Sequence, residues 1–366
     1  MPREVAGGLH TRSLLPPVSP APGSTMPDSD ALAAALAGDE TGFRRLVEPH
    51  RRELHAHCYR MLGSVHDAED ALQDTLLRAW RGLPRFEEGR PLRPWLYKIA
   101  TNVCLDEIAR RPTRVLPMDH GPPTDPSAGT DEAPVASIWV EPYPDEFPTL
   151  ESPDASPEAR YEQREALELA FITALQHLPG RQRAIVVLRE VLTFSAREVA
   201  DMLETTVPSV NSALQRARKT IEERVPDESQ QAALRSLGDD GIRGLVERFV
   251  NAFEAGDIDA ILSLLAEDVT FAMPPYPNWC WGRDAVSRSW LMPDGPPPRL
   301  RYAVTSANGQ LALGTYLLDA EAGRFLPIAF DVLTLRGALI SEVVAFRTPE
   351  VFAWFGLPDE LRLDHR

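Results

Sequence analysis

The sequence predicts a multidomain protein in which two all-α blocks precede a C-terminal α+β block. At 366 residues the chain is too long for one hydrophobic core, and two or three domains are expected. Apolar residues recur at helical spacing in residues 40–111 and 161–226, and a proline-rich stretch, residues 112–160, separates these blocks. Residues 238–358 combine two helical patterns with several runs of strand character.

The formal net charge of −16 at first argues against nucleic-acid binding, but its distribution removes the objection. Residues 41–115 carry 14 Lys and Arg against 10 Asp and Glu, whereas residues 116–165 carry 2 against 12. Residues 166–225 carry 8 against 7, and residues 226–366 carry 12 against 20. The two helical blocks are therefore neutral to basic, and the acidic residues are concentrated between and after them.

The composition excludes several classes of protein. Cys58, Cys104 and Cys280 are far apart and odd in number, so we expect no disulfide framework and a cytoplasmic location. His55 and His57 lie beside Cys58 in an apolar helical segment without a second ligand pair, which favours core and surface roles over a metal site. No apolar run could span a bilayer, the N-terminus lacks the apolar core of a secretory signal, and no cofactor is expected.

Two segments are expected to lack a fold of their own. Residues 1–39 are interpreted as a disordered N-terminal tail. Residues 112–160 hold eleven prolines and almost no apolar periodicity, so they should not bury enough surface to offset the entropy of ordering. We interpret them as an extended acidic linker.

The first block, residues 40–111, contains an amphipathic helix followed by a helix with a DNA-compatible stripe. Residues 68–80 place apolar side chains on one helix face, and the opposite face is polar and largely acidic. Beyond a Gly/Pro loop, Trp95, Lys98 and Asn102 share one side of the next helix, where they suit stacking, phosphate contact and base pairing in unstacked DNA. The alternatives are a merely solvated acidic face and a Trp95 that belongs to the core.

The second block, residues 161–226, has the pattern of a helix-turn-helix. Ser195 with Glu198 predicts a capping box for a helix over 196–203, a turn follows at Glu204, and Thr206 predicts the cap of the next helix. In that helix the expected buried stripe is Val207, Val210, Leu214, Ala217 and Ile221. The exposed face suits the major groove and consists of Ser209, Asn211, Ser212, Gln215, Arg216 and Lys219. A three-helix scaffold with a solvated face is the alternative.

The third block, residues 238–358, should be two helices, a strand over 269–273, a short helix near 284–290 and a sheet. The first helical stripe runs from Ile242 to Phe253, and the second ends at Leu265. In the run 326–335, Asp331 shares a face with apolar residues and should be a buried carboxylate with a raised pKa. An aromatic loop (Tyr276, Trp279, Trp281) has two readings: it lines a ligand pocket, or it docks onto another domain.

The motifs resemble the extracytoplasmic-function (ECF) sigma factors of bacterial RNA polymerase. The stretch DAEDALQDTLLRAW … FEEGRPLRPWLYKIATNVCLD is similar to their region 2, and the helix-turn-helix is similar to region 4. The third block resembles the SnoaL-like branch of the NTF2-like fold, a cone with an apolar pocket, and the whole chain resembles the sigma-G-like subgroup with such a domain fused.

The resemblance assigns roles to the candidate residues. The residues implied to bind the clamp helices of core RNA polymerase are Asp67, Glu69, Asp70, Gln73 and Asp74. Those implied to hold the melted −10 strand are Phe86, Arg90, Arg93, Trp95, Lys98 and Asn102. The exposed face of the recognition helix would read the −35 element. The linker, at roughly 3 Å per residue, could span the two elements.

The chain departs from the family pattern at several positions. Leu92 and Pro94 stand where an aromatic residue and a threonine are usual, which bears on base preference. Glu204 replaces a turn glycine, at a cost of about 1 kcal/mol if the backbone there is left-handed. Asn211 and Ala213 replace a basic pair, so we expect fewer phosphate contacts.

The expected function is that of a promoter-specificity subunit that does no covalent chemistry, with core RNA polymerase and promoter DNA as partners. The alternative is a helix-turn-helix regulator fused to a catalytic SnoaL-like cyclase or isomerase. A small-molecule ligand of the C-terminal domain and a separate anti-sigma partner are left open. We further expect the C-terminal domain to dock on the two helical blocks through its aromatic loop and to modulate them in cis.

Overall fold

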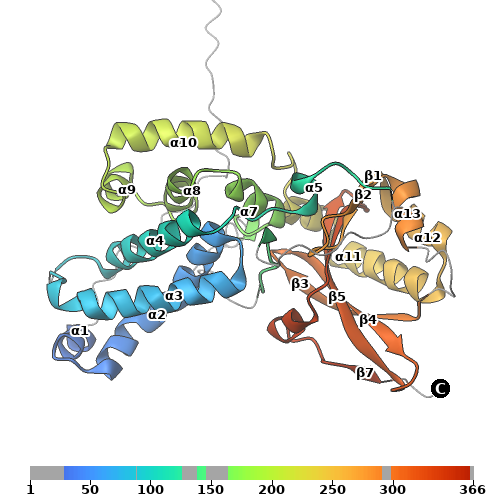
Figure 1. Cartoon of the computed structure of the whole chain (residues 1–366), viewed down its shortest axis with the longest axis horizontal. Helices are drawn as coiled ribbons and strands as arrows, with labels where there is room; N and C mark the ends of the chain where they lie inside the picture. Colours follow the sequence, from blue (N-terminus) through green and yellow to red (C-terminus); the bar gives the residue numbers. More distant parts are fainter. Residues whose placement is uncertain (1–28, 88, 126–137, 146–163, 291–297, 363–366) are drawn as a thin grey trace, which may run out of the picture.

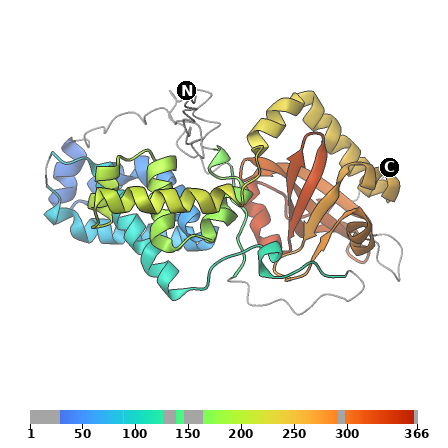
Figure 2. The same cartoon turned by 90° about the horizontal axis from the view of Figure 1, so that it is seen from above.

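The computed structural model describes residues 29–87, 89–125, 138–145, 164–290 and 298–362, and the statements below concern these residues. Two helical domains form one half of the molecule and a sheet with its helices forms the other half (Figures 1 and 2). The described parts of the expected linker lie between the halves.

The first helical domain consists of α1 (Ser29–Leu36), α2 (Glu40–Leu62), α3 (Val65–Gly82) and α4 (Leu92–Arg110), with a short 3-10 turn η1 (Leu83–Arg85). Asp39 caps α2, Ser64 caps α3, and Gly63 ends α2 in the left-handed conformation with a φ of 70°. The expected disordered tail is wrong for residues 29–36. Ala31, Leu32 and Ala35 of α1 are buried, and Gly42 allows α1 to approach α2 closely, because a Cβ there would lie 2.7 Å from that of Ala34.

The second helical domain consists of α7 (Leu169–Gln176), α8 (Gly180–Val186), the π-helical turn η4 (Val187–Val191), α9 (Ala196–Met202) and α10 (Val207–Glu222). The predicted capping box of Ser195 and Glu198 is confirmed, as is the cap of α10 by Thr206. The expected buried stripe of α10 is confirmed except for Val207, which is 37% exposed. Val207 is the first residue of α10 and comes before the residues that pack against the other helices of the domain, so its side chain stays partly exposed.

The C-terminal domain begins with α11 (Gln230–Ala255) and α12 (Ile258–Ser263), followed by β1 (Leu265–Ala272), β2 (Trp279–Trp281) and α13 (Arg283–Trp290). It continues with β3 (Leu300–Ala307), β4 (Gln310–Asp319), β5 (Arg324–Arg336), β6 (Leu339–Phe346), the 3-10 segment η5 (Pro349–Phe355) and β7 (Leu361–Arg362). The strand order is β2-β1-β6-β5-β4-β3, with β1 and β6 parallel and the other pairs antiparallel. The predicted second helix is too long by two residues, because Leu265 starts β1.

The sheet buries both of its faces, in two separate cores. One face packs with α11 and α13 around residues such as Leu245, Phe249 and Leu333. The other face, with Phe330 and Phe352, is continuous with the core of the helical domains. This continuity makes the C-terminal domain part of the same packed body as the two helical domains.

The expectation of an extended, unburied linker is wrong for residues 112–125 and 138–145. A short helix α5 (Pro117–His120) follows a parallel bridge between Val115 and Trp139. Trp139 is 3% exposed, and Val140 and Tyr143 are fully buried. These apolar side chains occur too sparsely to make a core of their own, but surfaces of the helical domains and of the C-terminal domain cover them.

The junction of the domains is built around the β3–β4 turn, Asn308–Gly309. Both residues have a positive φ, 55° and 69°, as a two-residue Asn-Gly hairpin turn requires. The Asn308 amide nitrogen donates to the Tyr59 hydroxyl of α2 (2.9 Å) and to the Leu167 carbonyl before α7 (2.8 Å). Its amide oxygen accepts from the backbone N–H of Tyr143 (2.8 Å). One fully buried side chain therefore joins all three domains and the linker.

Further hydrogen bonds surround this turn. The Gly309 N–H donates to Asp145 (2.7 Å), and the Leu169 N–H donates to the side chain of Gln310 (2.8 Å). The buried Glu168 accepts the backbone N–H of Gln231 (2.9 Å) at the start of α11. Burial raises the pKa of Glu168 to about 7, and the backbone donors only partly offset this effect. Hydrogen bonds made by Gln310 at the start of β4 and by Gln231 at the start of α11 thus hold the C-terminal domain to the second helical domain.

Asn308→Gly should destabilise the protein by about 3 kcal/mol. Glycine adopts the required φ freely, so the change removes only the side-chain hydrogen bonds and leaves buried partners unsatisfied at roughly 1–3 kcal/mol each. Urea unfolding would measure the loss. Asn251→Ala, on the exposed side of α11, is the matched control and should change the free energy of unfolding by less than about 0.5 kcal/mol. An Asn308→Gly variant as stable as this control would contradict the role given to the turn.

Candidate polymerase and nucleic-acid interfaces

The acidic side of α3 is partly open to solvent. Asp70 and Gln73 are exposed, and the side chains of Glu69 and Asp74 are 46% and 41% exposed. Gln73 donates to Glu69 (3.2 Å), and Asp74 pairs with Arg78 (2.9 Å). Four of the five predicted polymerase-binding residues therefore lie on one accessible surface.

Asp67, the fifth, faces the linker instead. It is 8% exposed, and its Oδ2 accepts hydrogen bonds from both Nη2 (2.6 Å) and Nε (3.2 Å) of Arg114, while its Oδ1 pairs with Arg111. Arg114 donates as well to the Trp139 carbonyl (2.6 Å). The nearby Glu141 accepts the Val65 N–H (2.9 Å) at the start of α3, where a carboxylate is favoured by the helix dipole. The linker thus occupies the N-terminal end of the acidic face.

Leu77 is a surface residue of α3 that the sequence prediction missed. It is 45% exposed and stands four residues after Gln73 and seven after Asp70, on the same ridge. The helical spacing of Asp70, Gln73 and Leu77 could have shown from the sequence that Leu77 lies on this ridge. An exposed leucine within an acidic ridge suits a protein contact that has an apolar centre and a polar rim.

The predicted −10 residues divide into a packed group and an exposed group. Phe86 is 7% exposed and packs on Trp95, with 5.0 Å between ring centroids, so the half-buried Trp95 belongs partly to the core. Asn102 is exposed on the same side of α4. The exposed Arg90 forms an ion pair with Glu87 (2.7 Å).

Arg93 and Lys98 are engaged by other parts of the molecule. Arg93 forms an ion pair with Glu53 (3.1 Å) and lies over the rings of Tyr97 and Phe194, at 5.0 and 4.7 Å from their centroids. Lys98 forms an ion pair with Glu204 (3.0 Å) in the turn before α10. Phe194 and Glu204 come from the second helical domain, which therefore covers part of the predicted −10 surface.

The two helical domains pack directly. A Cβ at Gly180, the first residue of α8, would lie 3.2 Å from side-chain atoms of Leu105 and Ile108 of α4. The buried Arg183 donates to the carbonyl of Met61 and to the side chain of Gln176 (2.5 Å). Glu204 itself has a φ of 50°, which confirms that this turn position adopts the left-handed conformation.

The exposed face of α10 holds all six predicted −35 residues at the outer edge of the helical half (Figure 1). The hydroxyl of Ser209 is 2.9 Å from that of the capping Thr206. Arg216 donates to the hydroxyl of Ser212 (2.7 Å), which holds its guanidinium along the helix. Gln215, Asn211 and Lys219 project from the same face, so the layout fits a helix that enters a major groove.

The aromatic loop of the C-terminal domain contacts the linker. The Trp279 indole N–H donates to the Gly121 carbonyl (2.8 Å), and the Thr124 N–H donates to the Trp279 carbonyl (2.8 Å). Tyr276 is half-buried and Trp281 is 59% exposed. The contacts found for Trp279 are thus with the linker, whereas contacts with the helical domains come from residues outside this loop, among them Asn308, Gln310 and Trp354, whose ring lies 4.6 Å from that of His66.

The predicted burial of Asp331 is confirmed. It is 8% exposed, accepts a hydrogen bond from Thr315 (2.6 Å), and burial raises its pKa to about 6. The same side of the sheet carries a cluster of rings formed by Phe249, Phe253, Phe271, Trp290 and Tyr302. These rings pack on one another on the side of the sheet that faces α11 and α13.

Cys58, Cys104 and Cys280 are buried free thiols in the structure. Within the described ranges, no cluster of three or more His, Cys, Asp or Glu side chains is arranged to hold a metal ion. Over the same ranges, no helix combines the length and apolar character needed to cross a membrane.

Comparison with known proteins identifies the family. Residues 46–113 match Sigma-70 region 2, residues 168–221 match Sigma-70 region 4, and residues 246–343 match the SnoaL-like domain. The ECF RNA polymerase sigma factor SigG of Mycobacterium tuberculosis is 41% identical over 322 residues, which cover 87% of this chain and 85% of SigG. The chain belongs to the ECF sigma factors. It is a transcription-initiation factor whose first helical domain is region 2, whose second is region 4, and whose C-terminal domain is SnoaL-like.

Two other comparisons agree with this family. SigW of Bacillus subtilis is 28% identical over 191 residues, covering 52% of this ECF sigma factor and 92% of SigW. The crystal structure of SigJ from Mycobacterium tuberculosis superimposes with a TM-score of 0.53 at 22% identity, covering 84% of this chain and 97% of SigJ. The SigJ likeness shows that the fold extends across the helical and C-terminal domains.

Asn102→Ala should lower open-complex formation about fivefold to tenfold and leave core-polymerase binding and stability unchanged, because Asn102 is exposed. Permanganate reactivity of −10 thymines would measure melting. Trp95→Ala should also lower stability, since Trp95 packs on Phe86. Asp106→Asn, one turn further along α4 and also exposed, is the control. Normal melting by Asn102→Ala would remove this residue from the −10 site.

Arg216→Ala should weaken promoter binding by about 1–3 kcal/mol and relax the preference at one −35 position, if the guanidinium reads a base. Competition binding against single-substitution promoters would measure both effects. Arg224→Ala, beyond the end of α10 and paired with Asp119, should leave the preference unchanged. A uniform loss of affinity on every promoter would instead assign Arg216 to a phosphate.

Proposed function

We propose that this ECF sigma factor directs core RNA polymerase to promoters through the surfaces described above, and that its C-terminal domain restrains it in a closed form. In this proposal the exposed part of α3 binds core polymerase, the Trp95–Asn102 side of α4 holds the −10 strand, and the outer face of α10 reads the −35 element. The proposal places the protein in the cytoplasm, where polymerase and promoter DNA are found. Region 2 would extend over residues 40–111, with α1 packed against it, region 4 over residues 161–226, and the C-terminal domain from α11 to β7, residues 230–362.

The direct packing of region 4 on region 2 carries the proposal of a closed form. The two promoter elements lie about two turns of DNA apart, at ~34 Å per turn, so their readers must separate to bind together. In the structure, Phe194 and Glu204 of region 4 instead cover Arg93 and Lys98 of α4. Opening would free these side chains, and residues 112–160 supply enough chain for the separation.

The C-terminal domain supports the closed form because it binds both regions at once. Asn308 contacts Tyr59 of region 2 and Leu167 at the start of region 4. The linker, held by Asn308 through Tyr143, in turn keeps Arg114 on Asp67. A tethered domain acts at an effective concentration of about millimolar, so moderate contacts suffice to populate the closed form.

We propose that the C-terminal domain acts without covalent chemistry. SnoaL-like relatives include enzymes, which makes a catalytic domain the second candidate. Residues 238–358 contain no histidine, and the buried Asp331 is engaged by Thr315 on the side of the sheet that carries the cluster of aromatic rings. These features fit a structural and regulatory domain better than an acid–base site open to substrate.

Asn308→Gly should raise the apparent affinity for core RNA polymerase about tenfold, because a larger share of molecules would be open and the apparent Kd scales inversely with that share. Titration of labelled protein with core enzyme would measure affinity, and a reconstituted assay would count promoter-dependent transcripts. Asn251→Ala should behave as the wild type.

The outcomes separate the two parts of the proposal. An unchanged core affinity in a folded Asn308→Gly variant would reject the restraint by the C-terminal domain. Absence of any promoter-dependent transcript with the wild-type protein would reject its role as an initiation factor at the surfaces assigned here.

A further inference from the structure

The carboxylate of Glu168 is buried where region 4 meets the C-terminal domain. Glu168 directly precedes α7, is 5% exposed and makes no side-chain hydrogen bond to the start of its own helix. It turns instead to α11, where it accepts the backbone N–H of Gln231 (2.9 Å). Among the described residues it forms no ion pair, and the charged side chain that shifts its pKa, Glu165, is also an acid. The ionised side chain is therefore removed from water without a counter-charge.

The elements around Glu168 bring further charged side chains to this contact. They are Arg60 of α2, Asp145 of the linker, Arg164 and Glu165 before α7, Arg235 of α11 and, beyond Gln310, Glu342 of β6. Arg60 and Arg235 each donate to a backbone carbonyl (3.1 and 3.4 Å). The third cation, Arg164, acts on Asp145 instead. Within the described residues, none of these cations forms an ion pair with Glu168.

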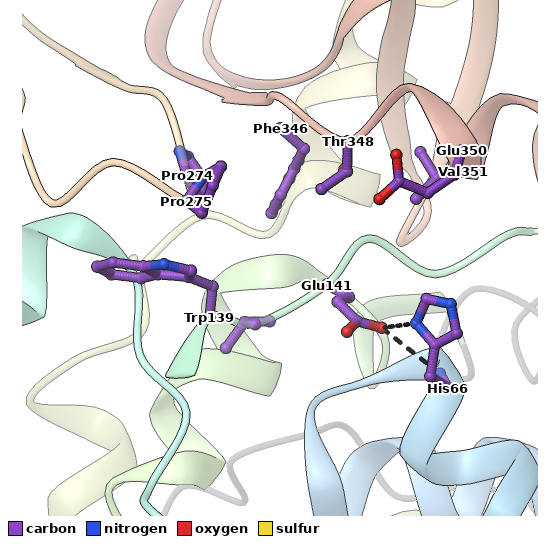
Figure 3. A pocket seen from close by; sticks show the side chains of 10 residues that line it. His66, Trp139, Glu141, Pro274, Pro275, Phe346, Thr348, Glu350 and Val351 are labelled. Carbon is purple, nitrogen blue, oxygen red and sulfur yellow. Dashed lines mark hydrogen bonds and ion pairs between the residues drawn. The ribbon is translucent and has the colours of Figure 1, made fainter. Parts of the chain in front are cut away.

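Two other carboxylates at the domain contacts have basic partners. Glu141 of the linker lies beside a cavity of about 250 Å³ between region 2 and the C-terminal domain, and His66 is 3.2 Å from it (Figure 3). Arg114 lies 3.6 Å from Glu141 and forms an ion pair with Asp67 (2.6 Å). Burying a charge is costly unless the charge is paired, so the charge of Glu168 opposes the packing, whereas basic partners compensate the other two.

We propose that Glu168 makes the contact between region 4 and the C-terminal domain pH-sensitive: its protonated form holds the two together, and its ionised form favours their separation. A protonated carboxyl keeps an oxygen that accepts the Gln231 N–H, so the contact is retained without a buried charge. Separation of the domains would return the side chain to water, where the ionised form is hydrated. The closed form would therefore bind up to one more proton than the open form.

The pH range follows from the pKa of Glu168. Burial raises this pKa from 4.5 to about 7, although the backbone N–H groups of Gln230 and Gln231 partly offset the effect. A carboxyl whose pKa is higher in the closed form favours closure fully below the ordinary value of 4.5, and this contribution is lost as the pH rises through about 7. Between pH 6 and pH 8 the ratio of closed to open molecules should fall about tenfold.

The consequence for transcription rests on the proposed function. In that proposal only open molecules bind core polymerase, so the apparent affinity scales with their share. A rise in pH through neutrality would release the sigma factor, and acidification would hold it closed.

The titration of Glu168 tests the first step directly. In protein labelled with ¹³C at the glutamate carboxyl groups, the Glu168 resonance would be identified by its absence from Glu168→Gln. It should titrate with a midpoint near pH 7, whereas a midpoint near 4.5 would overturn the proposal. If Glu168→Gln does not fold, the resonance can be assigned through bonds from the Glu168 amide, and the wild-type midpoint still decides.

Hydrogen exchange of amides at the junction measures the opening. The N–H groups of Leu169 and Asn308 donate across the junction (2.8 and 2.9 Å), and neither donates to Glu168. After correction for the intrinsic exchange rate, their protection factors should fall about tenfold more from pH 6 to pH 8 in the wild type than in Glu168→Gln, which stays neutral. Glu228→Gln, at an exposed position before α11, is the matched control and should behave as the wild type.

The comparison with Glu168→Gln is needed at each pH because histidines change charge over the same range. His66 and His177 both contact the linker, and their effect is common to all three proteins. An equal pH dependence of protection in the wild type and in Glu168→Gln would overturn the proposal.

Core-polymerase binding separates this inference from the proposed function. From pH 6 to pH 8 the affinity of the wild type should rise about tenfold more than that of Glu168→Gln. Proton-linked exchange without this difference in affinity would confirm the pH-sensitive contact and reject the restraint by the C-terminal domain. Equal exchange in the two proteins, together with tighter core binding by Asn308→Gly, would reject the pH-sensitive contact and retain the restraint.

Discussion

The hydrogen bonds of the Asn308 side chain hold together parts of the chain that are far apart in sequence. Asn308 and its partner Tyr59 are separated by 249 positions. The turn can supply them because an Asn-Gly hairpin projects its asparagine beyond the ends of β3 and β4. Each partner is buried, and buried polar groups must be paired. Neither the linker at Tyr143 nor the start of region 4 at Leu167 would have this pairing without the C-terminal domain.

Under the proposed function, the packing around this junction would keep the sigma factor inactive. Region 4 covers part of α4 and leaves the outer face of α10 open, so the two surfaces predicted to bind DNA are not equally covered. On α3, Asp67 is paired with Arg114 while Asp70 and Gln73 remain exposed. Under the proposed function, the closed form leaves these surfaces for a first encounter with polymerase and DNA, and full engagement would require the linker to leave Asp67.

The contacts that region 4 makes with Arg93 and Lys98 of α4 are individually modest. The Lys98–Glu204 pair is solvent-exposed, and such pairs contribute about 0–1 kcal/mol. Arg93 is better held, since it combines an ion pair with two aromatic faces, but both it and Glu53 keep some exposure. A switch needs this balance, because an equilibrium can be shifted by a ligand or by polymerase only when the two forms differ by a few kcal/mol.

Local interactions made much of the fold predictable from the sequence. The cap of α9 by Ser195, the left-handed turn at Glu204, the strand runs of the C-terminal domain and the burial of Asp331 all depend on neighbouring residues or on simple periodicity. The exposed faces of α3 and α10 were predictable for the same reason, apart from the buried Asp67, the partly exposed Val207 and the missed Leu77.

Only the tertiary structure decided which of these surfaces are used within the molecule. Prolines and acidic residues marked 112–160 as an unfolded linker, yet Trp139, Val140 and Tyr143 are buried, because their covering surfaces come from other domains. Likewise, no local sequence pattern shows whether Arg93 or Lys98 contacts DNA or another part of the same chain. The sequence by itself determined the family of this protein and most helices and strands of its three blocks, but not α1 or α5. Packing between distant segments decided where Asn308 binds, what Asp67 pairs with and where a cavity remains, since these depend on long-range contacts that no local pattern encodes.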